Sequence, residues 1–292
     1  MAISYLPLPI TLTPLPITQK IMSILSLLGR ASGATIGEMT VLDHLEELRW
    51  RLVRGAIVIV LFSIGAFIYM PYIFQNVILA HSKTDFWTYR MMCKIDVALC
   101  VDKLNFILQN KDMSGQFTMH LKSAFITGFI FGFPYLVWEI WGYVKPALEG
   151  REIKSSSKVV AFVPFLFIIG TMFGYFILAP LSVNFLANYQ LDSTILNQFD
   201  ISSYVSTITM LVLACGLIFQ LPVLIYFLAL AGIVTPELMK KYRKHAIVVV
   251  IIVAGIITPS PDMLSQIIVG IPIYLLYEIS IYTAARNKKV AI

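Results

Sequence analysis

The longest uncharged stretch of the sequence constrains the fold most. It runs from Ile201 to Thr235 and holds 35 residues without an acidic or basic side chain, and only Gln220 and Pro222 interrupt it. As a single helix it would measure about 52 Å at about 1.5 Å per residue, whereas the hydrocarbon core of a bilayer is about 30 Å thick. The stretch therefore predicts either two membrane spans or one long, tilted and kinked span.

The composition places the chain among membrane proteins. Of its 292 residues, 58% are hydrophobic and 13% are charged, and the mean hydropathy is +0.82. A soluble domain cannot bury so large an apolar share. The net charge of +6 does not indicate nucleic-acid binding, because the basic residues stand in short clusters between apolar runs, where they set membrane topology. We expect a polytopic membrane protein with no nucleic-acid partner.

Five further apolar runs are candidate spans, with approximate limits Gly55–Tyr69, Phe117–Trp138, Val159–Leu181, Ala246–Ile257 and Met263–Thr283. Pro180 is expected to close the third of the six runs. The fifth offers only 12 apolar residues, about 18 Å, and so implies a locally thinned bilayer. We expect the fifth and sixth helices to be short.

Basic residues fall into four clusters, which we place in the cytoplasm: Arg49, Arg51 and Arg54; Lys145, Arg151, Lys154 and Lys158; Lys240, Lys241, Arg243 and Lys244; Arg286, Lys288 and Lys289. Segments 181–203 and 258–262 contain no Lys or Arg. This pattern requires an odd number of crossings between 181–203 and Lys240, so Ile201–Thr235 is one span. The fold class predicted is an all-α membrane protein with six transmembrane helices and both termini in the cytoplasm.

Both ends of the chain are expected to lie outside the membrane domain. Residues 1–38 are rich in proline and have no basic leader, which predicts a disordered or surface tail, or an over-extended start. Residues 39–285 are expected to form one six-helix domain, and residues 286–292 a basic tail.

The stretch Met39–Arg54, MTVLDHLEELRWRLVR, joins a charged helix to the first span. Thr40 and Asp43 have capping-box spacing, and apolar residues then recur at helical intervals, so a helix should begin at Thr40. Glu46 and Glu47 place negative charge where this helix enters the bilayer. Pairing with arginines one turn further on is their simplest role, worth a few tenths of a kcal/mol.

Three motifs together resemble the TatC family, the receptor subunit of the twin-arginine protein translocase: HLEELR at His44–Arg49, FPYLVWEIWGYVKPAL at Phe133–Leu148, and TPSPDMLSQ at Thr258–Gln266. The resemblance covers about Met39 to Thr283. It implies a cytoplasmic-membrane protein that binds twin-arginine signal peptides of folded precursors and helps to export them. It also implies small single-span partners of TatA or TatB type, self-association in a receptor complex, energy from the membrane potential or proton gradient, no cofactor and no enzyme activity.

The resemblance also assigns the signal-peptide site. It makes Glu47 and Glu152 the recognition carboxylates, and the family's spacing selects Glu152 over the neighbouring Glu149. A guanidinium fork matches a carboxylate in bidentate geometry, which suits two acids to two arginines. Arg49 and Tyr143 are expected at the edges of this site.

A departure from the family pattern occurs in the fourth span. Where the family usually has a glutamate, this chain has Gln220 in the motif FQLP. Because Pro222 removes one backbone donor nearby, we expect Gln220 and Pro222 to face a groove that docks a partner's span. The alternative is that Gln220 bonds a neighbouring helix of its own chain.

An ion-coupled secondary transporter is the alternative function, suggested by the intramembrane polar residues Lys122, Gln220 and Glu278. Against it, the two halves of the chain show no inverted repeat. An enzyme or metal site is not indicated either, because the four histidines are scattered and no HExxH motif or Walker loop occurs.

Two cysteines lie in the long loop after the first span. Cys93 and Cys100 stand close in sequence on the side of the membrane expected to be oxidising, so a disulfide between them is a further hypothesis.

Overall fold

The structure is a computed structural model, and it describes residues 41–96, 100, 104, 106–145, 150–192, 194, 197–230, 232–258 and 263–288. Side chains are described in these ranges except at 41–44, 150–159, 230, 264 and 286–288. The chain divides into two compact units, Met1–Glu47 and Leu48–Ile292. The packing described below is that of the second unit.

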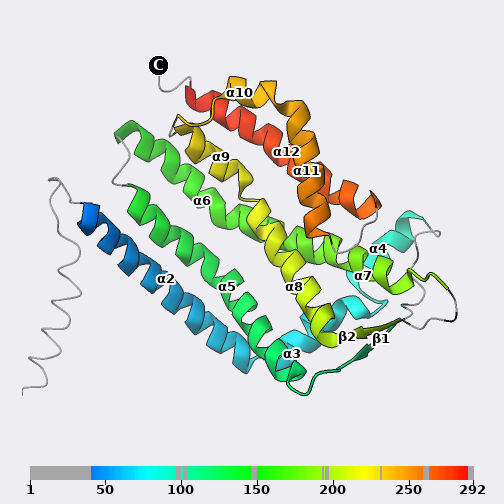
Figure 1. The fold of residues 1–292 in the computed structure, drawn as a ribbon. Helices are drawn as coiled ribbons and strands as arrows, with labels where there is room; N and C mark the ends of the chain where they lie inside the picture. Colours follow the sequence, from blue (N-terminus) through cyan, green and yellow to red (C-terminus); the bar gives the residue numbers. More distant parts are fainter. Residues whose placement is uncertain are drawn as a thin grey trace, which may run out of the picture. The chain divides into compact units, whose positions relative to one another are not determined.

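Helices make up most of the described chain (Figure 1). The long ones are α2 (Val41–Ile68), α5 (Gly115–Val144), α6 (Gly150–Phe173), α8 (Ile201–Ile218), α11 (Arg243–Ile257) and α12 (Met263–Lys288). Shorter helical pieces connect or extend them: α3 (Met70–Ile73), η2 (Phe74–Ile78), η3 (Leu79–Ser82), α4 (Trp87–Ile95), η6 (Gly174–Leu178), α7 (Ala179–Asn188), α9 (Leu221–Leu230) and α10 (Pro236–Lys241).

In the described part of the chain, five helical segments are long and apolar enough to cross a membrane: Leu45–Ile68, Gly115–Val144, Val160–Asn188, Ile201–Ala229 and Ser265–Ala285. Between 17% and 39% of the most apolar window of each is buried within the chain, so most of this apolar surface faces outward. Outward apolar surface on membrane-length helices identifies a polytopic all-α membrane protein.

Two expectations about helix length have different outcomes. The fifth helix is short, as expected: α11 has 15 residues, about 22 Å, and ends at Ile257. The expectation of a short sixth helix is wrong, because α12 has 26 residues. The apolar run was expected to end at Thr283, but α12 continues beyond it. A helix does not need apolar surroundings once it leaves the hydrocarbon core of the membrane.

Proline has different effects in the third and fourth spans. Pro180 does not end the third span: the helix widens into the π-helical turn η6 and continues as α7 to Asn188. A proline in the first turn of a helical segment is tolerated because its missing N–H is not needed there. In the fourth span the predicted kink is confirmed, since α8 ends at Ile218 and α9 begins at Leu221.

Among the described residues, the helices pack around four apolar clusters. Helix α6 lies against α8, α5 against α8, and α12 against both α9 and α11. Helix α2 lies along α5 (Figure 1), and the approach is close at Gly128, where a Cβ would come 2.1 Å from Ser63 Oγ. Side chains of α8, α11 and α12 interlock in one cluster, which includes Leu211, Ala254 and Ile273.

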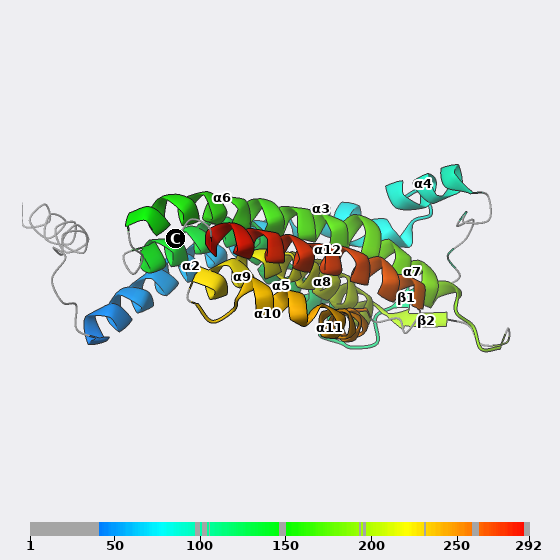
Figure 2. The same cartoon turned by 90° about the horizontal axis from the view of Figure 1, so that it is seen from above.

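Two loops meet at one end of the bundle. Strands β1 (Phe106–Gln109) and β2 (Asn197–Asp200) pair in parallel, with Phe106 opposite Asn197. Figure 2 shows β1, β2 and α4 at one end of the bundle, and the start of α6 and the last turns of α12 at the other. We call the β1, β2 and α4 end the cap end.

Candidate functional site

A buried carboxylate joins the first two long helices. Glu139 on α5 is only 7% exposed. Its Oε1 accepts a hydrogen bond from the Tyr135 hydroxyl at 2.7 Å and lies 3.5 Å from Arg54 Nε, while its Oε2 lies 3.7 Å from Arg51 Nη1. One carboxylate is therefore shared by a phenol from its own helix and two guanidinium groups from α2.

Helical spacing produces this arrangement. Tyr135 and Glu139 are four residues apart and share one face of α5, while Arg51 and Arg54 are three apart and share one face of α2. Gly142 leaves the space that Arg51 needs, because a Cβ there would come 2.1 Å from Arg51 Nη1. The acid cannot stay buried without such partners, since an unpaired carboxylate in a low-dielectric site is strongly unfavourable.

Glu139 was missed by the sequence reasoning, although it lies within the motif Phe133–Leu148. The signal was present. Glu139 is a single acid in an otherwise apolar helical run, and such an acid requires a partner. Tyr135 stands four residues before it, on the same helix face. What the sequence did not show is that α2, rather than a ligand or another subunit, supplies the cations.

The residues assigned by resemblance to the signal-peptide site are only partly described. Arg49 is exposed on α2, and Tyr143 is half-buried near the end of α5. Glu47 is half-buried and belongs to the first compact unit, so its position relative to α5 and α6 is not defined. Glu152 lies in the first turns of α6, and its side chain is outside the described residues. The pairing of Glu47 with Glu152 in one site stays a prediction.

Gln220 bonds within its own chain. Its Nε2 donates to the carbonyl oxygens of Val163 at 3.3 Å and Gly216 at 3.4 Å, so the amide points to α6 and to the preceding turn of α8. Pro222 is buried in the first turn of α9. The amide nitrogen therefore has the internal role given as the alternative, and docking of a partner's span at Gln220 and Pro222 stays a prediction. The physical reason is that the Val163 carbonyl of α6 lies close enough to accept from Nε2, while Oε1 is buried without a hydrogen-bond partner in the described part of the chain.

The other intramembrane polar residues also have partners. Lys122 Nζ donates to Ser206 Oγ at 2.8 Å, which ties α5 to α8. Glu278 on α12 accepts from Arg243 Nη2 at 2.7 Å and from the Tyr274 hydroxyl at 3.1 Å. These pairings explain Lys122 and Glu278 by helix packing and do not favour an ion-coupled transporter.

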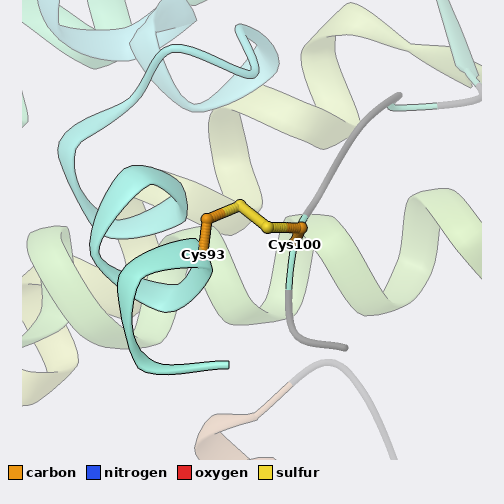
Figure 3. Close-up of a disulfide and its surroundings, with 2 residues drawn as sticks. All are labelled: Cys93 and Cys100. Carbon is orange, nitrogen blue, oxygen red and sulfur yellow. A yellow bond between two sulfur atoms is a disulfide. The ribbon is translucent and has the colours of Figure 1, made fainter. Parts of the chain in front are cut away.

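The two loop cysteines are joined. Cys93 at the end of α4 and Cys100 form a disulfide with Cα atoms 4.3 Å apart, as Figure 3 shows. Cys215 is a free thiol buried in α8. Among the residues that the structure describes, no three His, Cys, Asp or Glu side chains gather as a metal site.

Comparison with known proteins decides the family. The family model "Sec-independent protein translocase protein (TatC)" matches residues 43–272. The chain belongs to the TatC family. The TatC of Blattabacterium sp. subsp. Periplaneta americana is 38% identical over 252 residues, which cover 84% of this chain and 94% of that protein. TatCy of Bacillus subtilis is 30% identical over 246 residues, covering 84% and 89%.

Solved TatC structures share the fold. A crystal structure of the twin-arginine translocase receptor TatC matches with a TM-score of 0.61 and 28% identity, covering 83% of this chain and 98% of that one. A second crystal structure of the same receptor, in the detergent DDM, matches with a TM-score of 0.62. The TatC resemblance seen in the sequence is thereby confirmed, and the protein is a multi-pass inner-membrane subunit of the Sec-independent translocase.

Proposed function

We propose that this TatC protein is the receptor for twin-arginine signal peptides and the core subunit of the translocase that exports folded proteins. The observation that carries the proposal is the match to solved twin-arginine translocase receptors over 83% of the chain, from a sequence that keeps the acid-bearing motif HLEELR. A transport subunit of this kind needs no catalytic residues.

Two carboxylates give the proposed site its specificity. Glu47 on α2 and Glu152 on α6 each accept one arginine of the signal peptide. Charge-assisted hydrogen bonds contribute about 1.5–3 kcal/mol each, and a planar guanidinium makes two of them to one carboxylate, whereas a lysine makes a single point contact. Arg49 and Tyr143 border the site.

Glu139 is the positioning residue in this proposal. Arg51 and Arg54 of α2 both pair with the Glu139 carboxylate on α5. Glu139 thus keeps α2 against α5.

The proposed topology has six crossings with both termini in the cytoplasm. Besides the five membrane-length segments, α11 supplies the sixth crossing, and its roughly 22 Å requires a thinned bilayer. In the second compact unit, the start of α6 and the last turns of α12 lie at the same end of the bundle (Figure 2), in agreement with basic clusters on one side of the membrane. The cap end then faces outward.

The partners in this proposal are signal peptides, further copies of the chain, and small single-span subunits of TatA or TatB type. The outward apolar surface of the spans is consistent with helix partners, since α2 buries only 17% of its most apolar window within the chain.

Signal-peptide crosslinking tests the proposal. Full-length protein in inverted membrane vesicles is exposed to a twin-arginine peptide with a photoreactive group beside the arginine pair. The double variant Glu47→Ala with Glu152→Ala should lose most crosslinking, while insertion stays normal. A peptide with two lysines should crosslink weakly to the unmodified protein.

Glu46→Ala is the matched control, because Glu46 is an exposed acid on the same helix, adjacent to Glu47. It should crosslink like the unmodified protein. If the double variant binds the peptide normally, the two acids are not the recognition residues, and the simple salt-bridge role of this helix holds instead.

A further inference from the structure

Helix α4 lies at the cap end with one side fixed to a membrane span. Thr88 is 9% exposed, and its hydroxyl donates to the carbonyl oxygen of Phe176. Tyr89 is 1% exposed and donates from its hydroxyl to the carbonyls of Pro180 at 3.0 Å and His81 at 3.2 Å. These contacts hold α4 against η6 and the start of α7.

A neighbouring face of α4 carries an apolar stripe. Trp87, Met91 and Ile95 follow one another at intervals of four residues and are 51%, 38% and 76% exposed. Four-residue spacing places them on one face of a helix. Arg90 and Lys94 are also exposed and lie along one flank of this stripe, with Arg90 Nε 3.6 Å from the exposed Asp85 carboxylate. An apolar stripe with basic residues beside it and an aromatic anchor is the composition of helices that lie in a membrane interface.

The stripe is continuous with the lipid-facing surface of the third span. The Trp87 ring meets the Phe176 ring edge to face, with centroids 5.9 Å apart. On the same span, Met172 and Ile177 are 52% and 36% exposed. Counting about 20 residues for a 30 Å hydrocarbon core from Val160 brings the outer boundary close to Pro180, so Phe176 lies about one turn inside it.

We propose that α4 is a membrane-interface anchor, which inserts Trp87, Met91 and Ile95 into the acyl-chain boundary and turns Arg90 and Lys94 toward anionic phospholipid headgroups. Its partner is therefore the lipid surface on the cap side of the membrane. The anchor holds the loop between α2 and α5 down on the bilayer. It depends on the membrane location of the protein and not on signal-peptide recognition, so its test is independent of the function proposed above.

Tryptophan fluorescence with brominated lipids tests the anchor, because bromine quenches only nearby indole rings. The full chain carries Phe in place of Trp50, Trp138 and Trp141, which leaves Trp87 as the single tryptophan. It is reconstituted in vesicles of phosphatidylglycerol and phosphatidylcholine, brominated either near the headgroup end or near the methyl end of the acyl chains. A chain that retains only Trp138, which is 71% exposed on the span α5, is the positive control.

The anchor predicts a larger loss of Trp87 emission with bromine near the headgroup end than with bromine near the methyl end, and weak quenching by iodide in the water. Strong quenching by iodide without quenching by bromolipid would overturn the proposal. Absence of quenching by either agent would also overturn it, because it would mean that protein covers the Trp87 ring.

Two substitutions sharpen the test. Ile95→Asp in the Trp87-only chain should lower the bromolipid quenching, whereas Ile107→Asp, at an exposed isoleucine of β1 away from the stripe, should leave it unchanged. Retention of the Cys93–Cys100 disulfide, read by alkylation, shows that the loop of each variant still folds. Lys94→Glu should reduce quenching in phosphatidylglycerol vesicles but not in phosphatidylcholine alone. If Lys94→Glu changes the quenching by the same amount in both kinds of vesicle, the assigned contact with anionic headgroups is overturned.

Discussion

Arg54 of α2 reaches Glu139 of α5 across the interface between the first two long helices, with Nε 3.5 Å from Oε1. The carboxylate is buried, while the Arg54 side chain is 52% exposed. Removing one member of such a pair leaves its partner without compensation, and this loss is usually larger than the pair's net contribution to stability. Substituting either residue of this pair is therefore expected to lower the stability of the protein.

Glu139→Ala should lower the free energy of unfolding by about 1–3 kcal/mol, less than for a fully buried pair, because water screens the arginines. The measurement is SDS-driven unfolding in mixed micelles. Glu46→Ala, at an exposed acid, is the control and should have little effect. Replacing Arg51 and Arg54 by Gln together with Glu139→Gln should recover part of the loss. Unchanged stability in Glu139→Ala would show that the ion pairs contribute nothing.

Gly142→Ala should displace the Arg51 guanidinium, since the added Cβ would meet Nη1 at 2.1 Å. Arg51 can move, so the cost is a weakened ion pair, about 0.5–1 kcal/mol, rather than a steric clash with backbone. Gly65→Ala on α2 is the matched control, because nothing lies within 4 Å of the Cβ position there. If the ion pair is the cause, adding Gly142→Ala to Glu139→Ala should cost little more. Full additivity would contradict this.

His81 should make the cap end sensitive to acid. The ring is buried, and its Nε2 is 2.9 Å from the Tyr175 carbonyl. Burial lowers the pKa of His81 below its usual 6.5, although hydrogen bonds to backbone carbonyls partly oppose the shift. Below pH 6.5 the unfolded loop therefore binds a proton at His81 that the folded loop does not bind. The contribution of His81 to the stability of the folded loop is complete above pH 6.5 and falls as the pH drops below it.

Hydrogen exchange of segment 79–95 measures this effect. In the unmodified protein, protection should fall on acidification from neutral pH, while in His81→Phe it should vary much less with pH. A pH-independent difference between the two proteins would mean that the ring only packs and does not titrate.

The Cys93–Cys100 disulfide should stabilise the loop that holds α4. Closing a loop over a sequence separation of 7 corresponds to about 2–3 kcal/mol in the chain-entropy estimate. Alkylation without reductant should label neither cysteine, and after reduction both. Cys215, which is buried, should react only on unfolding and serves as an internal control. Full labelling of Cys93 and Cys100 before reduction would contradict the bond.

Gln220→Leu should destabilise the contact of α6 with α8 by about 0.6–2 kcal/mol, because it removes the amide bonds to the Val163 and Gly216 carbonyls. Copurification of small single-span subunits should stay near normal, since these bonds are internal. Loss of the partners at unchanged stability would support a docking role for Gln220.

The order and approximate limits of the spans follow from the sequence because uncharged runs and basic clusters are local signals. The break between Ile218 and Leu221 was also predictable, since Pro222 cannot donate a backbone hydrogen bond. That the third span continues as a helix through Pro180 was not predictable, because the continuation depends on a π-helical turn that no local sequence pattern specified.

The candidate site was less accessible from the sequence. Motifs assigned Glu47 and Glu152 by resemblance, but the partners of Glu139 and Gln220 depend on which helices become neighbours. Arg54 is distant from Glu139 in sequence, as Val163 is from Gln220. Only tertiary packing places these groups together, so periodicity and composition could show that a partner was needed but not which residue supplies it.

The parallel pairing of β1 with β2 has a mechanical consequence. Strand β2 passes directly into α8, and the Asp200 carboxylate accepts hydrogen bonds from the backbone of Ser203 and of Lys111, the latter in the linker between β1 and α5. Helices α5 and α8 are thus clamped together at one extremity. A stiff rod held at one end swings about that end, so its displacement grows with distance from the clamp. We therefore expect any change in the spacing of α5 and α8 to be smallest beside Gly115 and Ser203.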